Sequence, residues 1–248
     1  MASRSPRKPS RWIVVAAAAI VFLVAASTWV LLHRSGSGRP AGASPSSTSP
    51  ARPNGTQVTT VVAVDANGQP VNGYREVPTS EDPSNVTNVF DCDVSPAAVA
   101  NDIYYCAPDA AGADVCWPST PGTLLCLDDP WDKELRRVAY AGPLSQVQPT
   151  PAPAPFALFL DDGTRCRLRN GGAWGVRDDG LVGAYGCPNE TPAVLVPVPP
   201  KAGESAIDRS QPLWTVKVGS LGGGEPHLPP PQTRTVTTAW FAGTSGPT

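Results

Sequence analysis

One uncharged apolar segment, Trp12–Leu32, constrains this chain more than any other feature. It holds 21 residues without a charged side chain. A helix of that length spans about 31 Å, at a rise of about 1.5 Å per residue, and the hydrocarbon core of a bilayer is about 30 Å thick. The segment therefore predicts a single transmembrane helix, with residues 1–11 as a short tail on one side and the rest of the chain on the other.

The charges on either side predict the orientation of this helix. Four basic residues precede it, whereas 15 basic and 21 acidic residues follow it and leave the second part at −6. Basic residues beside a transmembrane segment stay in the cytoplasm, so we expect the N-terminus inside the plasma membrane and the C-terminal part outside. An acidic outer part also argues against nucleic acid as a partner, because phosphate contacts require a basic surface.

The apolar segment has two interpretations, a retained anchor or a cleaved signal. Signal peptides usually carry a shorter apolar region, of about 7–15 residues, followed by a cleavage site of small residues. This segment is longer and has no convincing site of that kind at its outer edge, and no lipid-modified cysteine follows it, since the first cysteine is Cys92. The sequence favours an anchor; a mature chain that starts near Ser35 would indicate a signal.

All six cysteines lie on the predicted outer side. They are Cys92, Cys106, Cys116, Cys126, Cys166 and Cys187. An even number of cysteines in an oxidising compartment indicates disulfides, and their spacing contains no paired Cys-x-x-Cys zinc pattern. Six cysteines allow many pairings, and the sequence does not decide among them. The set favoured here is sequential, 92 with 106, 116 with 126 and 166 with 187.

The outer part divides by composition. Residues 35–56 are almost entirely Ser, Gly, Pro, Ala and Thr, which predicts a flexible tether with a reach of about 70 Å at about 3.1 Å per residue. Residues 57–243 are then the extracytoplasmic domain, mostly β, linked by disulfides and containing short helices. A proline-rich stretch, 148–155, either connects two lobes, 57–148 and 156–243, or lies across a single domain. The single domain is favoured.

Residue patterns predict the individual elements. Runs rich in β-branched and apolar residues, bounded by Gly, Pro and Asp, predict strands. These runs are 56–64, 115–117, 124–127, 156–160, 164–168, 181–187, 214–218 and 233–241. Pro-Ser-Thr-Pro-Gly and Asp-Asp-Gly predict hairpins at 118–122 and 161–163. Two short helices are expected, at 95–100 after the N-cap Ser95 and at 129–137, where acids come first and arginines last.

Several stretches resemble exported, membrane-anchored or lipid-anchored proteins of mycobacteria and other actinobacteria. The stretches are Asp161-Asp-Gly-Thr-Arg-Cys-Arg-Leu-Arg-Asn-Gly-Gly-Ala-Trp-Gly, Leu181-Val-Gly-Ala-Tyr-Gly-Cys, Asp208-Arg-Ser-Gln-Pro-Leu-Trp-Thr-Val-Lys-Val and Thr237-Thr-Ala-Trp-Phe. The resemblance implies a location and a fold rather than a chemistry. Because the acylated cysteine of the lipid-anchored proteins is missing here, it also implies that the helix replaces the lipid.

An arginine stripe is the sharpest basic cluster of the outer part. Residues alternate between the two faces of a strand, so Cys166 and Leu168 point to one face and Arg165, Arg167 and Arg169 to the other. Arginine forms bidentate contacts with phosphate, which makes this stripe, with Arg177, a candidate site for an anionic component of the cell envelope. The competing interpretation is a solvated strand face that pairs with nearby aspartates.

Other candidate sites have a weaker basis. Trp174 lies in a loop where it is placed either to stack on a sugar or to cover a small core. The acidic pairs at 128–129, 161–162 and 178–179 lack the spacing of a calcium loop and suit turns, so we expect no metal and no cofactor. No Gly-x-Ser-x-Gly motif is present, and beyond the membrane edge the only histidine is His227, which disfavours a catalytic triad.

The sequence supports three hypotheses about function. The first is a membrane-anchored envelope protein whose outer domain binds or structures something without catalysing a reaction. The second is a hydrolase of cell-wall glycan that uses only carboxylates. The third is an outer domain that regulates a membrane partner through Trp12–Leu32, in which Ala, Ser and Thr would allow close helix packing.

Overall fold

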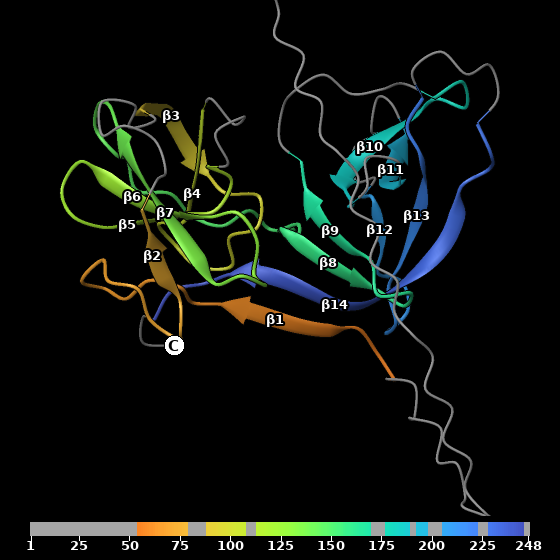
Figure 1. Cartoon of the computed structure of the whole chain (residues 1–248), viewed down its shortest axis with the longest axis horizontal. Helices are drawn as coiled ribbons and strands as arrows, with labels where there is room; N and C mark the ends of the chain where they lie inside the picture. The colour runs from red at the N-terminus through yellow and green to blue at the C-terminus, as the bar shows by residue number, and fades with distance from the viewer. Residues whose placement is uncertain are drawn as a thin grey trace, which may run out of the picture. The chain divides into compact units, whose positions relative to one another are not determined.

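The computed structural model describes residues 54–78, 88–107, 113–169, 177–188, 192–197, 205–222 and 228–245. In these ranges the chain forms fourteen strands and no helix (Figure 1), which confirms the expectation of a mostly β fold. No membrane-spanning helix is found among the described residues. Trp12–Leu32, the tail 1–11 and residues 35–53 of the tether lie outside them, so the anchor stays a prediction.

Strands β2 to β7 form the first sheet. Their bounds are β2 (Arg75–Val77), β3 (Asn88–Val94), β4 (Tyr104–Ala107), β5 (Cys116–Pro118), β6 (Thr123–Leu127) and β7 (Glu134–Tyr140). The order is β2-β7-β3-β4-β5-β6, and β6 also pairs with β7, so that β3 to β7 close into a ring. β2 and β3 run parallel to β7, and the other neighbours are antiparallel.

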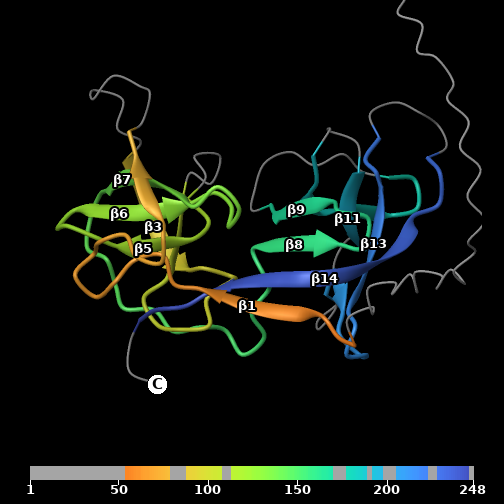
Figure 2. The same ribbon diagram turned by 60° about the horizontal axis from the view of Figure 1, so that its bottom comes forward.

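Strand β1 and strands β8 to β14 form the second sheet. Their bounds are β1 (Gln57–Val61), β8 (Ala157–Leu160), β9 (Arg165–Leu168), β10 (Leu181–Gly186), β11 (Pro192–Pro197), β12 (Ile207–Asp208), β13 (Thr215–Ser220) and β14 (Gln232–Ala242). The order is β1-β14-β8-β9-β10-β11-β13-β12, and a further pairing of β13 with β14 closes an antiparallel ring. β14 is long because it pairs with β8 and also with both β13 and β1 (Figure 2).

Three hydrophobic clusters stabilise these sheets, and one of them contains residues of both. It joins Trp117, Leu125 and Leu135 of the first sheet to Val61 and Ala157 of the second. The indole Nε1 of Trp117 donates a hydrogen bond of 2.8 Å to the carbonyl of Gly243, directly after β14. The alternation of β5 to β7 explains this: one face of these strands contributes to the shared cluster, and the opposite face, with Leu124 and Val138, contributes to a cluster within the first sheet.

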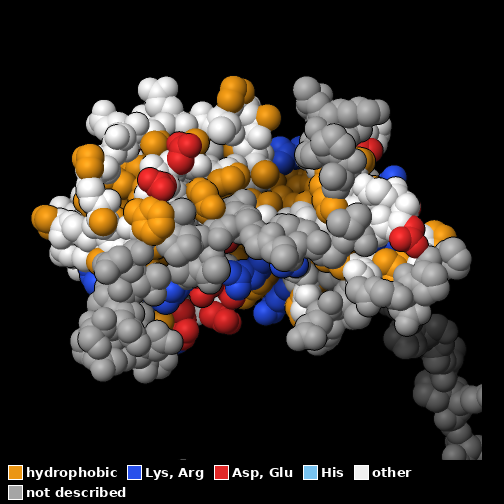
Figure 3. Space-filling model, turned by 90° about the horizontal axis from the view of Figure 1, so that it is seen from above, with side chains coloured by type: hydrophobic (Ala, Val, Ile, Leu, Met, Phe, Trp, Pro, Cys, Tyr) orange, Lys and Arg blue, Asp and Glu red, His pale blue; other side chains and the backbone are white. Residues whose placement is uncertain are grey.

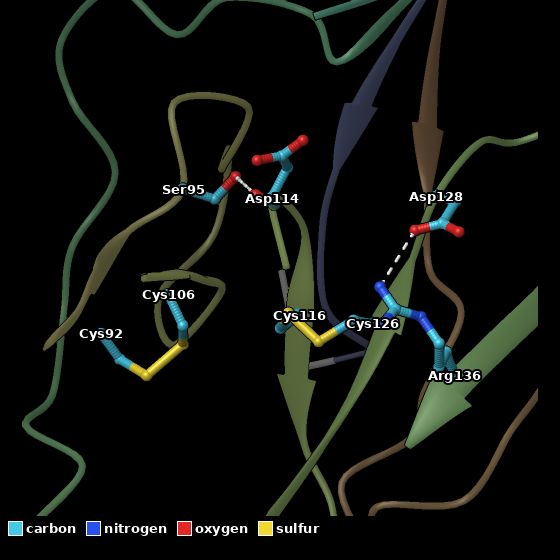
Figure 4. The surroundings of a disulfide bond; sticks show 8 residues. All are labelled: Cys92, Ser95, Cys106, Asp114, Cys116, Cys126, Asp128 and Arg136. Atoms are coloured by element: carbon cyan, nitrogen blue, oxygen red, sulfur yellow. Dashed lines mark hydrogen bonds and ion pairs between the residues drawn. A yellow bond between two sulfur atoms is a disulfide. The ribbon is translucent and has the colours of Figure 1, made fainter. Parts of the chain in front are cut away.

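The three disulfides confirm the sequential pairing. They join Cys92 to Cys106, Cys116 to Cys126 and Cys166 to Cys187, and no described cysteine is free. Figure 4 shows the first two bonds, together with the Ser95 hydroxyl that donates to the Asp114 carbonyl at 2.7 Å. Cys116 and Cys126 lie directly opposite each other on β5 and β6. The bonds are part of the hydrophobic clusters rather than of the surface, because Cys106, Cys116, Cys126 and Cys166 are fully buried.

The two predicted helices are wrong. At 95–100 the chain makes a single turn, in which the Ala98 amide donates to the Ser95 carbonyl, and then pairs with the end of β14. The Val99 amide donates to the Ala242 carbonyl at 2.8 Å, so the backbone bonds that a helix would use internally go to a distant strand. The capping signal of Ser95 was real, because its hydroxyl accepts from the Ala97 amide, but it caps only a turn.

The segment 129–137 becomes a turn followed by β7. The Asp129 carboxylate accepts the backbone amides of Trp131 and Asp132, and Lys133 has a positive φ of 54° that ends any helical path. Glu134–Tyr140 then pairs along its length with β2, β6 or β3. Asp129, one of the early acids that suggested a helix, accepts hydrogen bonds in the turn, and the late arginines lie in β7. Pairing between strands therefore outweighed a weak local preference for helix.

The proline-rich stretch 148–155 runs between β7 and β8 and contacts both sheets. The Ala154 amide donates to the Pro96 carbonyl, and the guanidinium of Arg209 donates to the Pro153 carbonyl at 3.0 Å. The buried hydroxyl of Tyr185 donates to the Pro155 carbonyl at 2.9 Å. Whether 57–148 and 156–243 fold as two lobes or as one domain stays a prediction.

Candidate functional site

Strand β9 carries the arginine stripe and sets its orientation. It follows the predicted hairpin at Asp161–Gly163, where Gly163 has a φ of 85°. Cys166 is fully buried in the core of the second sheet, bonded to Cys187. Its neighbours Arg165 and Arg167 therefore lie on the opposite face, Arg165 exposed and Arg167 half-buried. The predicted division of the two faces is correct.

Arg165 contacts an aromatic pair. Its guanidinium carbon lies 5.4 Å from the ring centroid of Trp131, which belongs to the turn between β6 and β7. Trp131 meets Trp240 of β14 edge to face, with centroids 5.9 Å apart and an angle of 80°. The Nε1 atom of Trp131 is buried and has no hydrogen-bond partner among the described groups. Arg165 thus connects β9 of the second sheet to a turn of the first through a cation–π contact.

Arg177 differs from the rest of the predicted stripe, because it is only 3% exposed. Its guanidinium donates to both carboxylate oxygens of Asp179, with a shortest distance of 2.7 Å. Its Nη1 atom donates to the carbonyl of Ser220 at 2.7 Å, and Nη2 donates also to the carbonyl of Pro229 at 2.9 Å. Arg177 therefore connects its own turn to the end of β13 and to the segment at Pro229, and it is not available to an external ligand.

The last two predicted site residues are Arg169 and Trp174. Arg169 follows β9 and is exposed, and its Cδ atom lies 3.0 Å from the position that a Cβ atom on Gly186 would occupy. The missing side chain of Gly186 in the neighbouring strand β10 therefore makes room for Arg169. Trp174 lies outside the described residues, so its role stays a prediction. Of the five candidates, the structure brings together Arg165 and Arg167 on one exposed face.

The acidic pairs act mainly as turn acceptors and as partners of arginine. Asp162 accepts the Thr164 amide and also binds Arg234, which lies 3.7 Å from Asp161. Asp129 accepts two amides of its own turn, and Asp128 lies 3.5 Å from Arg136 (Figure 4). Among the described residues, no three acidic, histidine or cysteine side chains converge as metal ligands would. Figure 3 likewise shows basic and acidic side chains next to each other rather than one continuous basic area.

Several pockets contain carboxylates that a hydrolase would require. One, of about 420 Å³, is lined by Asp208 and Lys217, and another, of about 330 Å³, by Asp65 and Asp102. A smaller one, of about 120 Å³, is lined by Arg136 and four acidic residues, Asp128, Asp129, Asp132 and Glu134. The Ser210 amide lowers the pKa of Asp208, and the Gln69 amide lowers that of Asp65. A general acid needs a raised pKa so that it holds a proton near neutral pH. These two carboxyl groups are therefore shifted in the wrong direction for that role.

Sequence reasoning missed the most highly connected arginine of the first sheet. Arg137 of β7 binds Glu76 of β2 through two parallel hydrogen bonds of 2.6 and 2.7 Å. Its third nitrogen donates to the hydroxyls of Ser119, Thr120 and Thr123 in the hairpin between β5 and β6. Residues 135–139 read Leu-Arg-Arg-Val-Ala, without the strict alternation that indicates a strand, and the acids before them suggested a helix.

Comparison of the chain with protein-family models, with curated proteins and with solved structures finds no match.

Proposed function

We propose that the chain is a membrane-anchored protein whose β-rich part lies outside the plasma membrane and binds or structures an anionic component of the cell envelope without catalysing a reaction. The observation that carries the proposal is that three disulfides lie within the hydrophobic clusters. Buried disulfides form and persist in an oxidising compartment, which favours the outer side of the membrane. The uncharged segment Trp12–Leu32 supplies the anchor in this proposal.

Arg165 and Arg167 are the residues through which we expect the ligand to bind. Both lie on the face of β9 opposite the buried Cys166, and neither forms an ion pair with a described carboxylate. Arg165 is held in place by the ring of Trp131, so its free edge is oriented without an acidic partner that an anion would have to displace. A phosphorylated or carboxylated glycan fits this arrangement, because arginine binds such groups bidentately and an aromatic neighbour suits a sugar.

Carboxyl chemistry favours binding over hydrolysis. Each described carboxyl group with a resolved pKa shift has a lowered pKa, in most cases because it accepts hydrogen bonds from amides or arginine. Such groups stay ionised at neutral pH and accept rather than donate protons. The glycosidase mechanism requires one carboxylic acid that is still protonated.

The test is sedimentation of the intact chain with purified wall glycan, together with analysis of the glycan afterwards. We expect binding without new chain ends, and we expect the double substitution Arg165→Ala and Arg167→Ala to weaken binding by about tenfold, as for the loss of a charge-assisted contact. The double substitution Arg75→Ala and Lys217→Ala removes the same charge elsewhere and should leave binding unchanged. Equal losses in both variants would contradict a specific site, and release of new reducing ends would favour the hydrolase.

A further inference from the structure

Strand β1 borders the second sheet and has one neighbour, β14, to which it runs parallel (Figures 1 and 2). The Val61 carbonyl accepts the Gly243 amide at 2.8 Å, so the backbone groups of Val61 point toward β14. Because these groups alternate in direction along a strand, Gln57 and Thr59 also bond to β14. Val58 and Thr60 therefore point their amide and carbonyl groups away from the sheet.

The outward side of β1 is accessible and uncharged. Val58 is 54% exposed, Thr60 is also exposed, and no described group bonds to the backbone of either residue. A Cβ atom at Gly243 would lie 2.5 Å from a methyl group of Thr60 and 3.8 Å from methyl groups of Val62 and Val99. Val99 is itself 41% exposed. The unpaired backbone thus lies beside a small cluster of β-branched side chains.

Other borders of the sheets carry the features that usually prevent strand addition, whereas β1 does not. β2 presents Arg75 and Glu76 and is followed by Pro78. β12 is only two residues long and ends in Asp208. Proteins commonly protect edge strands with charges, proline or short length. Residues 56–64 contain no charged residue, proline or glycine. β1 is the edge at which pairing with another strand is least opposed.

We propose that β1 pairs antiparallel with β1 of a second copy of this chain, about a two-fold axis at Thr59. Val58 of each copy then lies opposite Thr60 of the other, and these residues exchange their amide and carbonyl bonds, about four in all. Thr59 lies opposite its own counterpart in a pair without hydrogen bonds. Pairing of two identical strands in this register brings no like charges opposite each other, because residues 57–61 contain no charged side chain.

A second copy fits this edge better than an unrelated strand for a reason that rests on the proposed function. Residues 1–53 lead directly into β1. If Trp12–Leu32 anchors each chain, the β1 strands of two copies are tethered to one membrane through segments of identical length. Such tethering raises the effective concentration of one edge for another, so a weak contact of a few hydrogen bonds suffices.

A cysteine at position 59 tests this geometry directly. The six native cysteines are paired, so an added thiol is the only one available. Directly opposed residues of a pair without hydrogen bonds have Cα atoms about 4.5 Å apart. Cys116 and Cys126, opposed in the same way, have a Cα separation of 4.0 Å and form a disulfide. Under mild oxidation, the full-length Thr59→Cys protein should form a covalent dimer in membranes, at least tenfold more than Gln146→Cys at an exposed site elsewhere.

Charge exchange at the edge provides the decisive control. In the Thr59→Cys background, chains with Val58→Lys and Thr60→Lys should not crosslink with themselves, and neither should chains with Val58→Glu and Thr60→Glu. Mixing the two kinds should restore the dimer, because each Lys then faces a Glu. Oxidation of the six native cysteines in each variant verifies that the fold is intact.

Other outcomes would overturn the proposal. They are a Thr59→Cys dimer no more abundant than the control both in membranes and in detergent, a dimer that persists in both charged variants, or crosslinking to a different protein in place of a second copy. The same crosslink measured with the concentrated, detergent-purified chain tests strand pairing alone. A dimer in detergent but not in cells would therefore count against the membrane anchor and leave the pairing intact.

Discussion

Arg165 and Arg177 show how differently two arginines of similar sequence context are used. Both lie near aspartates in the chain, and the sequence groups them as one basic cluster. Arg177 is buried and donates to Asp179 and to two backbone carbonyls, whereas Arg165 is exposed and rests on a tryptophan ring. Period-two alternation predicts the direction of Arg165, but nothing local predicts that Arg177 meets Ser220 and Pro229. Such long-range partners depend on the closure of the sheet.

Removal of these two side chains should therefore have unequal effects on stability. Arg177→Ala removes a buried guanidinium and leaves Asp179 and the carbonyls of Ser220 and Pro229 without their donor, and we expect the free energy of unfolding to fall by about 3 kcal/mol. Arg165→Ala removes an exposed cation–π contact and should lower it by no more than about 1 kcal/mol. Urea unfolding of both variants measures the difference; equal losses would contradict the structural role given to Arg177.

Acid should weaken the contact between Glu76 and Arg137. The hydrogen bonds from Arg137 lower the pKa of Glu76 in the folded chain. A carboxyl group with a lowered folded pKa adds stability that is present above its unfolded pKa, about 4.3, and is lost as the pH falls through the folded value. Glu76→Gln should therefore be less stable than the parent at pH 7 and should approach it near pH 3. A constant difference over this range, measured by urea unfolding, would contradict the assignment.

At the level of elements, strand patterns predict well and helix signals mislead. The expected strands at 156–160, 164–168 and 181–187 correspond to β8, β9 and β10, because apolar runs with Asp-Gly turns leave little alternative. The sequence patterns do not predict β2, β3, β4, β11 or β12. β3 contains two aspartates and β11 begins and ends with proline, residues that are uncommon in strands, and pairing with β4 and β10 makes them regular. Strand pairing also replaced both predicted helices.

The turn at 65–70 gives a prediction about close packing of elements. Gly68 has a φ of 75°, and a Cβ atom there would lie 2.6 Å from the Cα atom of Ser119 in the β5–β6 hairpin. Gly163 has a φ of 85° but open space around that position. Gly163→Ala should lower the free energy of unfolding by about 1 kcal/mol through backbone strain alone. Gly68→Ala should lower it by at least twice as much, because its methyl group would also meet Ser119. Thermal unfolding of both variants compares them, and a smaller loss for Gly68→Ala would contradict the contact.

The disulfides should contribute unequally to the free energy of unfolding, according to the length of the loop that each one closes. Replacement of Cys166 and Cys187 by Ala removes a link over a separation of 21 residues, against 10 for Cys116 and Cys126. In the chain-entropy model each bond is worth about 3 kcal/mol, and the longer loop contributes more. Denaturant unfolding without reductant should rank the two double variants in that order. The reverse order would show that native packing, rather than loop length, determines their contributions.

For the whole molecule, strand patterns and cysteine count were enough to predict a β-rich fold with three disulfides. They were not enough to predict that two closed rings share a hydrophobic cluster, in which Trp117 and Leu135 of one meet Val61 and Ala157 of the other. The candidate site was predictable only as far as the exposed face of β9. Its contact with Trp131 and the unpaired edge of β1 arise from the way the strands are ordered in space.

The most direct test of the central claim is the thiol and N-terminal state of the full-length chain in cells. The chain is isolated from the membrane fraction after alkylation without reductant, and its mass and N-terminal peptide are measured. An anchored protein with its β-rich part outside predicts six unalkylated cysteines in three disulfides and a chain that retains Trp12–Leu32. Alkylated cysteines, or a mature N-terminus near Ser35, would contradict it.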